Sequence, residues 1–136
     1  MLKYFYQILK GKTMIIKESA QNYLETILVI KNKNGSVRSI DVANHLGFSK
    51  PSVSVAMKSF REEGYITTDE NGLIELTQKG LLIAEEMYER HHIIAHALMA
   101  IGVSEDTAYE DSCKIEHHIS KESFEKIKSY LEKIKD

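Results

Sequence analysis

Apolar residues recur at helical spacing along most of the chain. Between Glu18 and Lys31, apolar side chains return every three or four residues, at Tyr23, Ile27 and Ile30, which predicts an amphipathic helix. The same spacing predicts further helices, and these cover residues 39–46, 50–63 and 77–100, with one more after Ser104 and a last one after Ser120. The pattern therefore predicts a mostly α-helical protein.

Capping and turn residues set the ends of these helices. Ser39 and Ser49 are predicted N-caps, because a serine oxygen accepts a hydrogen bond from a free first-turn N–H. Pro51 falls in the first turn of the third helix, where its missing N–H costs nothing. Gly47 and Gly64 end the second and third helices, because glycine adopts the left-handed conformation that closes a helix.

The period of the pattern changes to about two after the third helix. Residues 65–68 and 73–76 predict two short strands. The turn between them contains Asn71 and Gly72, and Asn-Gly is a strong hairpin signal. Three helices followed by a hairpin indicate a winged helix-turn-helix.

The predicted fold is mostly α, with an N-terminal winged helix-turn-helix domain and a C-terminal helical dimerisation domain. We assign residues 1–17 to an N-terminal extension, 18–84 to the DNA-binding domain and 85–136 to the metal-binding and dimerisation domain. A monomer of this kind reads only one half-site. The sequence therefore predicts a homodimer on a palindromic double-stranded DNA operator.

The outward side of the third helix carries the candidate DNA contacts. Hydroxyl and ammonium groups dominate there, and both suit phosphate and base-edge contacts. The predicted contact residues are Arg38, Ser49, Lys50, Pro51, Ser52, Ser54, Val55 and Lys58. A winged helix used for protein contact is the alternative, since the recognition helix is only mildly basic and the wing tip is acidic at Asp69 and Glu70.

Charge and cysteine content place further limits on the protein. The net charge of −2 argues against indiscriminate coating of nucleic acid, but a specific binder needs only one positive surface. The single cysteine excludes an internal disulfide and fits a reducing cytosol. No apolar run reaches the roughly 20 residues of a membrane span, and the apolar start, Met1 to Leu9, is too short for a signal peptide. A cytoplasmic protein without membrane contact is expected.

The second half of the chain carries a metal-binding pattern. Five of the six histidines lie between His91 and His118. Cys113, Glu116 and His117 are spaced i, i+3, i+4 and are predicted to share one face of a helix. Thiolate, carboxylate and imidazole together suit a borderline divalent metal. The alternative interpretation is that exposed histidines and glutamates coincide by chance and that the cysteine is a small buried hydrophobe.

Several segments make the chain resemble a known family. They are residues 22–25, the recognition helix 49–54, the segment 76–80, Arg90-His91, residues 101–103 and residues 113–120. In these the sequence is similar to the diphtheria-toxin-repressor family of iron- and manganese-responsive regulators, especially the short manganese-type members. The resemblance implies six metal ligands, which are Asn22, Glu25, His91, Cys113, Glu116 and His117.

Two of these positions depart from the manganese pattern. The resemblance implies an aspartate at Asn22 and a glutamate at Cys113 in manganese-type members, whereas iron-type members carry the cysteine. Fewer hard oxygen donors weaken the preference for manganese. We expect Mn²⁺ or Fe²⁺, with Zn²⁺ and Co²⁺ as further candidates. Iron-type members have an ancillary glutamate where this chain has Ala95, and His92, His96 and His118 are expected to be solvated or packed.

Three functions follow from these patterns. The first is a metal-dependent transcriptional repressor of genes for metal uptake or homeostasis. The second is a winged-helix regulator whose metal site is degenerate and whose DNA binding is metal-independent. The third is a small zinc enzyme built on Cys113, Glu116 and His117, but no separate general base is apparent for it.

Overall fold

The computed structural model describes residues 2–135, with side chains from residue 18 onward. It is mostly helical and divides into two compact units, Met1–Glu85 and Glu86–Asp136. The predicted fold class is confirmed.

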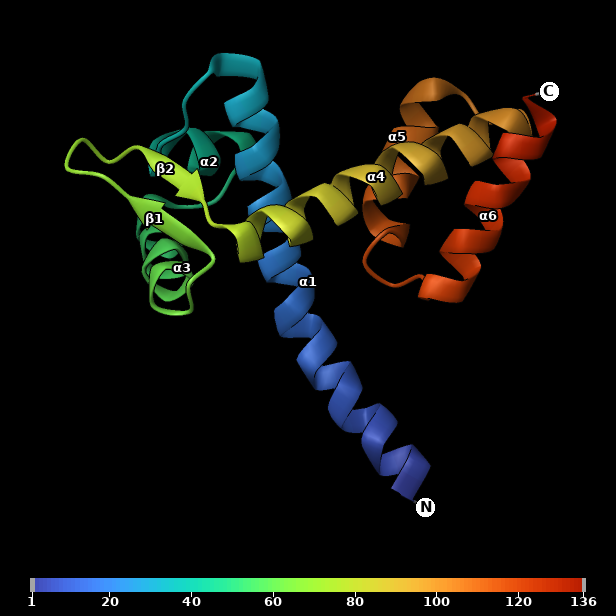
Figure 1. Ribbon diagram of the computed structural model, residues 1–136, viewed down its shortest axis with the longest axis horizontal. Helices are drawn as coiled ribbons and strands as arrows, with labels where there is room; N and C mark the ends of the chain where they lie inside the picture. Colours follow the sequence, from blue (N-terminus) through green and yellow to red (C-terminus); the bar gives the residue numbers. More distant parts are fainter. Residues whose placement is uncertain (1, 136) are drawn as a thin grey trace. The chain divides into compact units, whose positions relative to one another are not determined.

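The first unit has the element order of a winged helix-turn-helix (Figure 1). Its elements are α1 (Leu2–Asn34), α2 (Ser39–Leu46), α3 (Lys50–Glu62), β1 (Ile66–Thr68), β2 (Ile74–Leu76) and the start of α4 (Gln78–Ala100). The prediction that the first helix begins at Glu18 is wrong, because α1 begins at Leu2. No proline interrupts the preceding residues, so nothing in the backbone chemistry stops the helix there.

A single apolar core holds these elements together. Apolar side chains from α1, α2, α3 and both strands are buried in it, and they include Leu24, Ile27, Val42, Val53, Met57, Phe60, Ile66 and Ile74. The inner face of α3 is thereby fixed against α1 and α2. Its opposite face is left to solvent.

An aromatic contact fixes the turn between α2 and α3. The ring of Tyr23 on α1 packs edge-on against Phe48 in this turn, with centroids 5.8 Å apart, and against Phe60 of α3 at 5.5 Å. Edge-to-face packing at these distances is favourable. The start of the recognition helix is therefore tied directly to α1.

The predicted ends of α2 and α3 are largely confirmed. Gly47 closes α2 in the left-handed conformation at φ 71°. The Ser49 hydroxyl accepts a hydrogen bond from the Ser52 N–H at 3.3 Å and caps α3. The predicted cap at Ser39 is wrong by one residue, since α2 begins there and Arg38 holds the cap position, where its N–H donates to Asp41 Oδ2 at 2.9 Å.

The hairpin forms as the sequence predicts. β1 and β2 pair antiparallel, with Ile66 opposite Leu76. In the turn, Asp69 Oδ1 accepts from the N–H groups of Asn71 and Leu73, both at 2.9 Å. Figure 1 shows the hairpin extending beyond α2 and α3 as a wing.

The wing is fastened to the start of α4 at close range. Thr77 Oγ1 donates to the Gly64 carbonyl at 2.6 Å and accepts from the Gly80 N–H at 3.2 Å, so Thr77 caps α4, which begins one residue later than the predicted range 77–100. Gly80 lies so close to Tyr65 that a Cβ at this position would stand 2.1 Å from the Tyr65 carbonyl oxygen. The junction therefore requires glycine for space.

The second unit consists of the rest of α4, α5 (Glu105–Ile115) and α6 (Lys121–Ile134). Its buried apolar residues come from all three helices, and they are Met87, Ile94, Ala95, Ala108 and Phe124. Gly102, at φ 104°, provides the predicted break between α4 and α5. Ser120 caps α6 by accepting from the Ser123 N–H at 3.1 Å.

The Gly80→Ala variant tests the junction between wing and helix. Glycine to alanine in a helix normally stabilises by roughly 1 kcal/mol. Here the new Cβ meets a backbone carbonyl, so we expect a net loss of about 1–3 kcal/mol in the free energy of unfolding. Urea unfolding followed by circular dichroism measures the change. Gln78→Ala, at an exposed position of the same turn, is the matched control, and a Gly80→Ala protein as stable as this control would contradict the packing described.

Candidate metal centre and DNA-binding face

The predicted DNA contacts all lie on the surface of the first unit. Arg38, Ser49, Lys50, Pro51, Ser52, Ser54, Val55 and Lys58 are each exposed. Val55 is 71% exposed although it is aliphatic. The structure therefore exposes seven of these side chains at the start and along the outer face of α3, whereas Arg38 stands at the start of α2.

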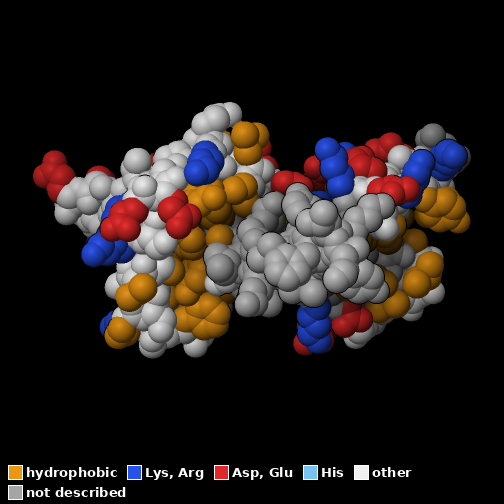
Figure 2. Space-filling model, turned by 90° about the horizontal axis from the view of Figure 1, so that it is seen from below, with side chains coloured by type: hydrophobic (Ala, Val, Ile, Leu, Met, Phe, Trp, Pro, Cys, Tyr) orange, Lys and Arg blue, Asp and Glu red, His pale blue; other side chains and the backbone are white. Residues whose placement is uncertain are grey.

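The tip of the wing has the opposite charge. Figure 2 shows acidic side chains at the outer tip of the hairpin, and the exposed acidic residues of that turn are Asp69 and Glu70. Carboxylates repel a phosphate backbone. The wing tip is therefore unsuited to phosphate contact, whereas Lys50, Lys58 and Arg38 present exposed cationic side chains.

Four of the six predicted metal ligands gather in the second unit. His91 on α4 has its Nδ1 atom 2.8 Å from Glu116 Oε2 and 3.7 Å from Cys113 Sγ on α5. The Nε2 atom of His117 lies 3.2 Å from the other Glu116 oxygen, Oε1. Glu116 is thus the centre of the cluster, and it is only 2% exposed.

The chemistry of this donor set fits a transition-metal ion. Imidazole, thiolate and carboxylate groups are the ligands that borderline divalent metals accept together. The buried carboxylate of Glu116 already faces two imidazoles, as expected for a site that stabilises positive charge. The residues present therefore fit the ion that the sequence predicts.

The local backbone differs from the prediction in one respect. α5 ends at Ile115, so Glu116 and His117 stand in the turn that follows, and the prediction that one helix carries Cys113, Glu116 and His117 is wrong. Glu116 still has helical angles, φ −56° and ψ −30°, and its N–H donates to the Ser112 carbonyl at 3.0 Å. The side chains therefore keep the shared face that the i, i+3, i+4 spacing predicts.

Electrostatics in the cluster favour a bound cation. Hydrogen bonding to Cys113 and then to Glu116 raises the pKa of His91 to about 10, against the opposing effect of burial. In the metal-free protein His91 is therefore an imidazolium at neutral pH. A metal ion that binds here replaces this positive charge.

The other two predicted ligands belong to the first unit. Asn22 and Glu25 stand one helical turn apart on α1, and so share one face of that helix. Glu25 is buried and Asn22 is half-buried.

The remaining histidines of this region have other surroundings. His92 packs against Tyr88, with ring centroids 4.4 Å apart, and its Nδ1 lies 3.3 Å from the Tyr109 hydroxyl. Burial lowers the pKa of His92, as do the neighbouring His91 and His96. His118 is exposed.

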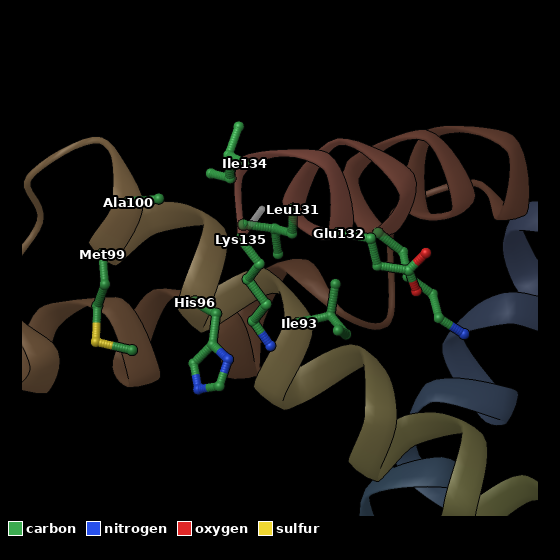
Figure 3. A pocket seen from close by; sticks show the side chains of 9 residues that line it. Ile93, His96, Met99, Ala100, Leu131, Glu132, Ile134 and Lys135 are labelled. Atoms are coloured by element: carbon green, nitrogen blue, oxygen red, sulfur yellow. The ribbon is translucent and has the colours of Figure 1, made fainter.

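His96 lines a hollow between α4 and α6 (Figure 3). The hollow has a volume of about 410 Å³, and its walls include Ile93, Met99, Leu131 and Ile134. Most of the lining is apolar, which is typical of a packing surface rather than of a metal site.

Sequence reasoning did not assign a role to two residues that hold the cluster. The guanidinium of Arg90 donates to the carbonyl oxygens of Glu116 at 3.2 Å and of Ile119 at 3.0 Å. The hydroxyl of Ser112 donates to the carbonyl oxygen of His91. The sequence signal for Arg90 is its place directly before His91, in one of the segments that resemble the family.

Two family models cover nearly the whole chain. Residues 16–73 match the N-terminal DNA-binding domain of the iron-dependent repressor, and residues 77–136 match its metal-binding and dimerisation domain. The described residues contain no helix that is long and apolar enough to cross a membrane.

Similar individual proteins are also named as transcriptional regulators. An uncharacterized HTH-type transcriptional regulator of Methanocaldococcus jannaschii is 33% identical over 89% of this chain and 98% of its own length. The transcriptional regulator MntR of Escherichia coli is 32% identical over 86% of this chain and 76% of its own length.

Solved structures share the fold. A hypothetical protein from Sulfolobus solfataricus is 26% identical with a TM-score of 0.64, over 83% of this chain and 87% of that one. The manganese regulator SloR has a TM-score of 0.72 at 24% identity, covering 83% of this chain. The present chain spans about half of SloR, 53% of its length.

The raised pKa of His91 gives a direct test of the cluster. In metal-free protein we expect the His91 imidazole to remain protonated at about pH 8, where an unperturbed histidine is neutral. Cys113→Ala and Glu116→Gln should each move this pKa down toward its ordinary value, because each removes a hydrogen-bond partner of the imidazolium. Nuclear magnetic resonance of the labelled imidazole nitrogens measures it, with Lys114→Ala on the same helix as control. Deprotonation of wild-type His91 near the ordinary pKa would contradict the geometry.

Proposed function

The chain belongs to the iron-dependent repressor family of metal-dependent transcriptional regulators, and from this premise we propose that it represses genes of metal uptake or homeostasis. The family, also called the diphtheria-toxin-repressor family, consists of DNA-binding regulators and not of enzymes. The metalloenzyme alternative is therefore set aside. The observation that carries the proposal is the cluster of His91, Cys113, Glu116 and His117 in a chain whose recognition helix is exposed.

A divalent metal ion is proposed to bind to the donor atoms of this cluster. His91, Cys113, Glu116 and His117 hold it from the second unit, and Asn22 and Glu25 complete the ligand set from α1. The family resemblance supports the last two, as does their spacing of one turn on α1. When bound, the ion supplies a localised double positive charge that thiolate, carboxylate and imidazole groups can share.

The donor set also bears on which ion is used. SloR is described as a manganese regulator. This chain has a thiol at Cys113 and an amide at Asn22, and softer or neutral donors favour Fe²⁺, Zn²⁺ or Co²⁺ over Mn²⁺. We propose that the chain responds to Mn²⁺ less strongly than to at least one of the other three.

Metal binding is proposed to act on DNA binding through the arrangement of domains in a homodimer. The dimerisation domain, residues 85–136, pairs two chains, and each chain presents one recognition helix from its domain at 18–84. A ligand shared by both domains favours one arrangement of them over others. That arrangement matches the two helices to successive major grooves of a palindromic operator, so metal affinity and DNA affinity are coupled.

One observation favours a second candidate function. Asn22 offers a neutral amide where the manganese pattern has a carboxylate, which reduces the charge available to hold an ion. A regulator with a degenerate site would bind DNA equally well with and without metal. The experiment below separates the two functions.

A titration of DNA binding tests the proposed function. Fluorescence anisotropy with the protein's own promoter region is measured without metal and with Mn²⁺, Fe²⁺, Zn²⁺ or Co²⁺ at matched free concentrations. We expect tight binding only with metal, and we expect His91→Ala and Glu116→Ala to abolish the metal response because each removes a ligand. His96→Ala, on the same helix but in the apolar hollow, is the matched control and should respond as wild type. Equal binding with and without metal would establish the degenerate site instead.

The salt dependence of DNA binding tests the recognition face. Lys50→Ala and Lys58→Ala should each weaken metal-activated binding for all sequences and reduce the slope of log affinity against log salt by about 1, because each removes one phosphate contact. Anisotropy titrations at several potassium chloride concentrations give the slope. Lys126→Ala, an exposed lysine of α6, should leave it unchanged. An unaltered slope in both α3 variants would mean that this face does not contact phosphate.

A further inference from the structure

Arg90 occupies an unusual position next to the metal cluster. It precedes His91 on α4, and although it carries a full charge it is only 8% exposed. Charged side chains are rarely buried to this degree unless they bind specific partners. Its partners therefore indicate what it does.

The guanidinium binds the backbone of the turn that carries two ligands. One nitrogen, Nη1, donates to the carbonyl oxygens of Glu116, at 3.2 Å, and of Ile119, at 3.0 Å. These two carbonyls lie at either end of the short connection between α5 and α6, and Glu116 and His117 both belong to it. Arg90 thus ties the backbone of this connection to α4.

The location of these carbonyls strengthens the contact. The last carbonyls of a helix have no partner within the helix and carry partial negative charge. The Glu116 carbonyl stands directly after the end of α5, so a buried cation meets favourable charge there. The planar guanidinium can direct several donors at fixed angles, which a lysine ammonium cannot do.

The rest of the Arg90 environment adds packing but leaves one donor unused. Nη2 lies 3.2 Å from Glu86 Oε1, and the guanidinium stands over the Phe124 ring at 5.4 Å. The Nε atom is buried and has no hydrogen-bond partner among the described residues. An unsatisfied donor on a buried charge is costly, so stability alone does not explain why arginine stands at this position.

A second hydrogen bond joins the same two segments, with its donor on α5 and its acceptor on α4. The hydroxyl of Ser112, which is completely buried, donates to the carbonyl oxygen of His91. α4 and the segment 112–119 are therefore tied twice, on either side of the contact between His91 and Glu116. Two such ties restrict how far these ligands can move apart.

We propose that Arg90 is a positioning residue of the metal centre. It acts through the backbone of the turn after α5 and holds the Glu116 carboxylate and the His117 imidazole in the positions from which they bind the ion beside His91. This inference rests on the proposed function, since it gives Arg90 a role in the same site. Residues that orient metal ligands from outside typically change metal affinity 10- to 100-fold when they are replaced, which is about the effect expected here.

The test uses full-length protein and three variants. Arg90→Lys keeps a positive charge but loses the planar donors, and Arg90→Met keeps much of the bulk without charge. Glu86→Gln is the matched control, because it removes the exposed ion pair with Arg90 and leaves both carbonyl contacts intact. Zn²⁺ affinity is measured by competition with a chromophoric chelator. The visible spectrum of the Co²⁺ complex, including its thiolate-to-cobalt band, reports the geometry at Cys113.

We expect Arg90→Lys to bind Zn²⁺ about 10- to 100-fold more weakly than wild type and to give an altered Co²⁺ spectrum, with Glu86→Gln close to wild type. A merely structural role would lower the unfolding temperature of the metal-free protein and leave the Co²⁺ spectrum unchanged, and that result would overturn the proposal. If Arg90→Met fails to fold, the role of Arg90 is judged from Arg90→Lys alone, provided that the circular dichroism spectrum of this variant matches that of wild type.

The same data separate this inference from the proposed function. A wild-type Co²⁺ spectrum without a thiolate band would show that the metal does not use Cys113, and the ligand set of the proposed function would then be wrong, while the Zn²⁺ affinity of Arg90→Lys would still decide the role of Arg90 at Glu116 and His117. A wild-type thiolate band together with unchanged affinity and spectrum in Arg90→Lys would overturn the role of Arg90 alone.

Discussion

The contact between His91 and Glu116 is the interaction around which the second unit is organised. A buried carboxylate lies 2.8 Å from an imidazole, and such a charge is stable away from water only when opposite charge and hydrogen bonds surround it. The nearby His117 and Cys113 supply part of these polar surroundings. Arg90 and Ser112 donate hydrogen bonds to backbone carbonyls and so hold α4 and the segment 112–119 together. This contact therefore links the local backbone path to metal-binding chemistry, because the groups that stabilise Glu116 are also the predicted metal ligands.

The core of the first unit holds the polar recognition helix α3 at a fixed angle. Its recognition helix has little apolar surface on its outer face, and its buried residues are the inner ones, Val53, Met57 and Phe60. The Tyr23 ring extends this support to the turn before α3 through Phe48. Fixing both the helix and its entry turn leaves the hydroxyls and lysines of the outer face exposed, as a DNA-reading surface requires.

Most of the fold was predictable because its signals are local. The cap at Ser49 and the left-handed Gly47 each depend on bonds within a few residues, so the sequence predicts them directly. The start of α1 was predicted wrongly because nothing local stops that helix before Glu18. The end of α5 at Ile115 was also missed, since the turn that follows continues helical angles at Glu116. The contacts of Arg90 were beyond prediction, because they join α4 to backbone carbonyls more than twenty residues away, whose position depends on the path of that turn.

The state of the metal-free cluster bears on how a regulator of this kind would work. Hydrogen bonds to Cys113 and Glu116 raise the pKa of His91 to about 10, so at neutral pH an ion competes with a proton for this imidazole. An ion that binds there must displace this proton. Under the proposed function, Asn22 and Glu25 from the DNA-binding domain are also ligands of this ion. Because the ligands come from both domains, the ion favours one arrangement of the domains over others, and this arrangement is what metal binding controls.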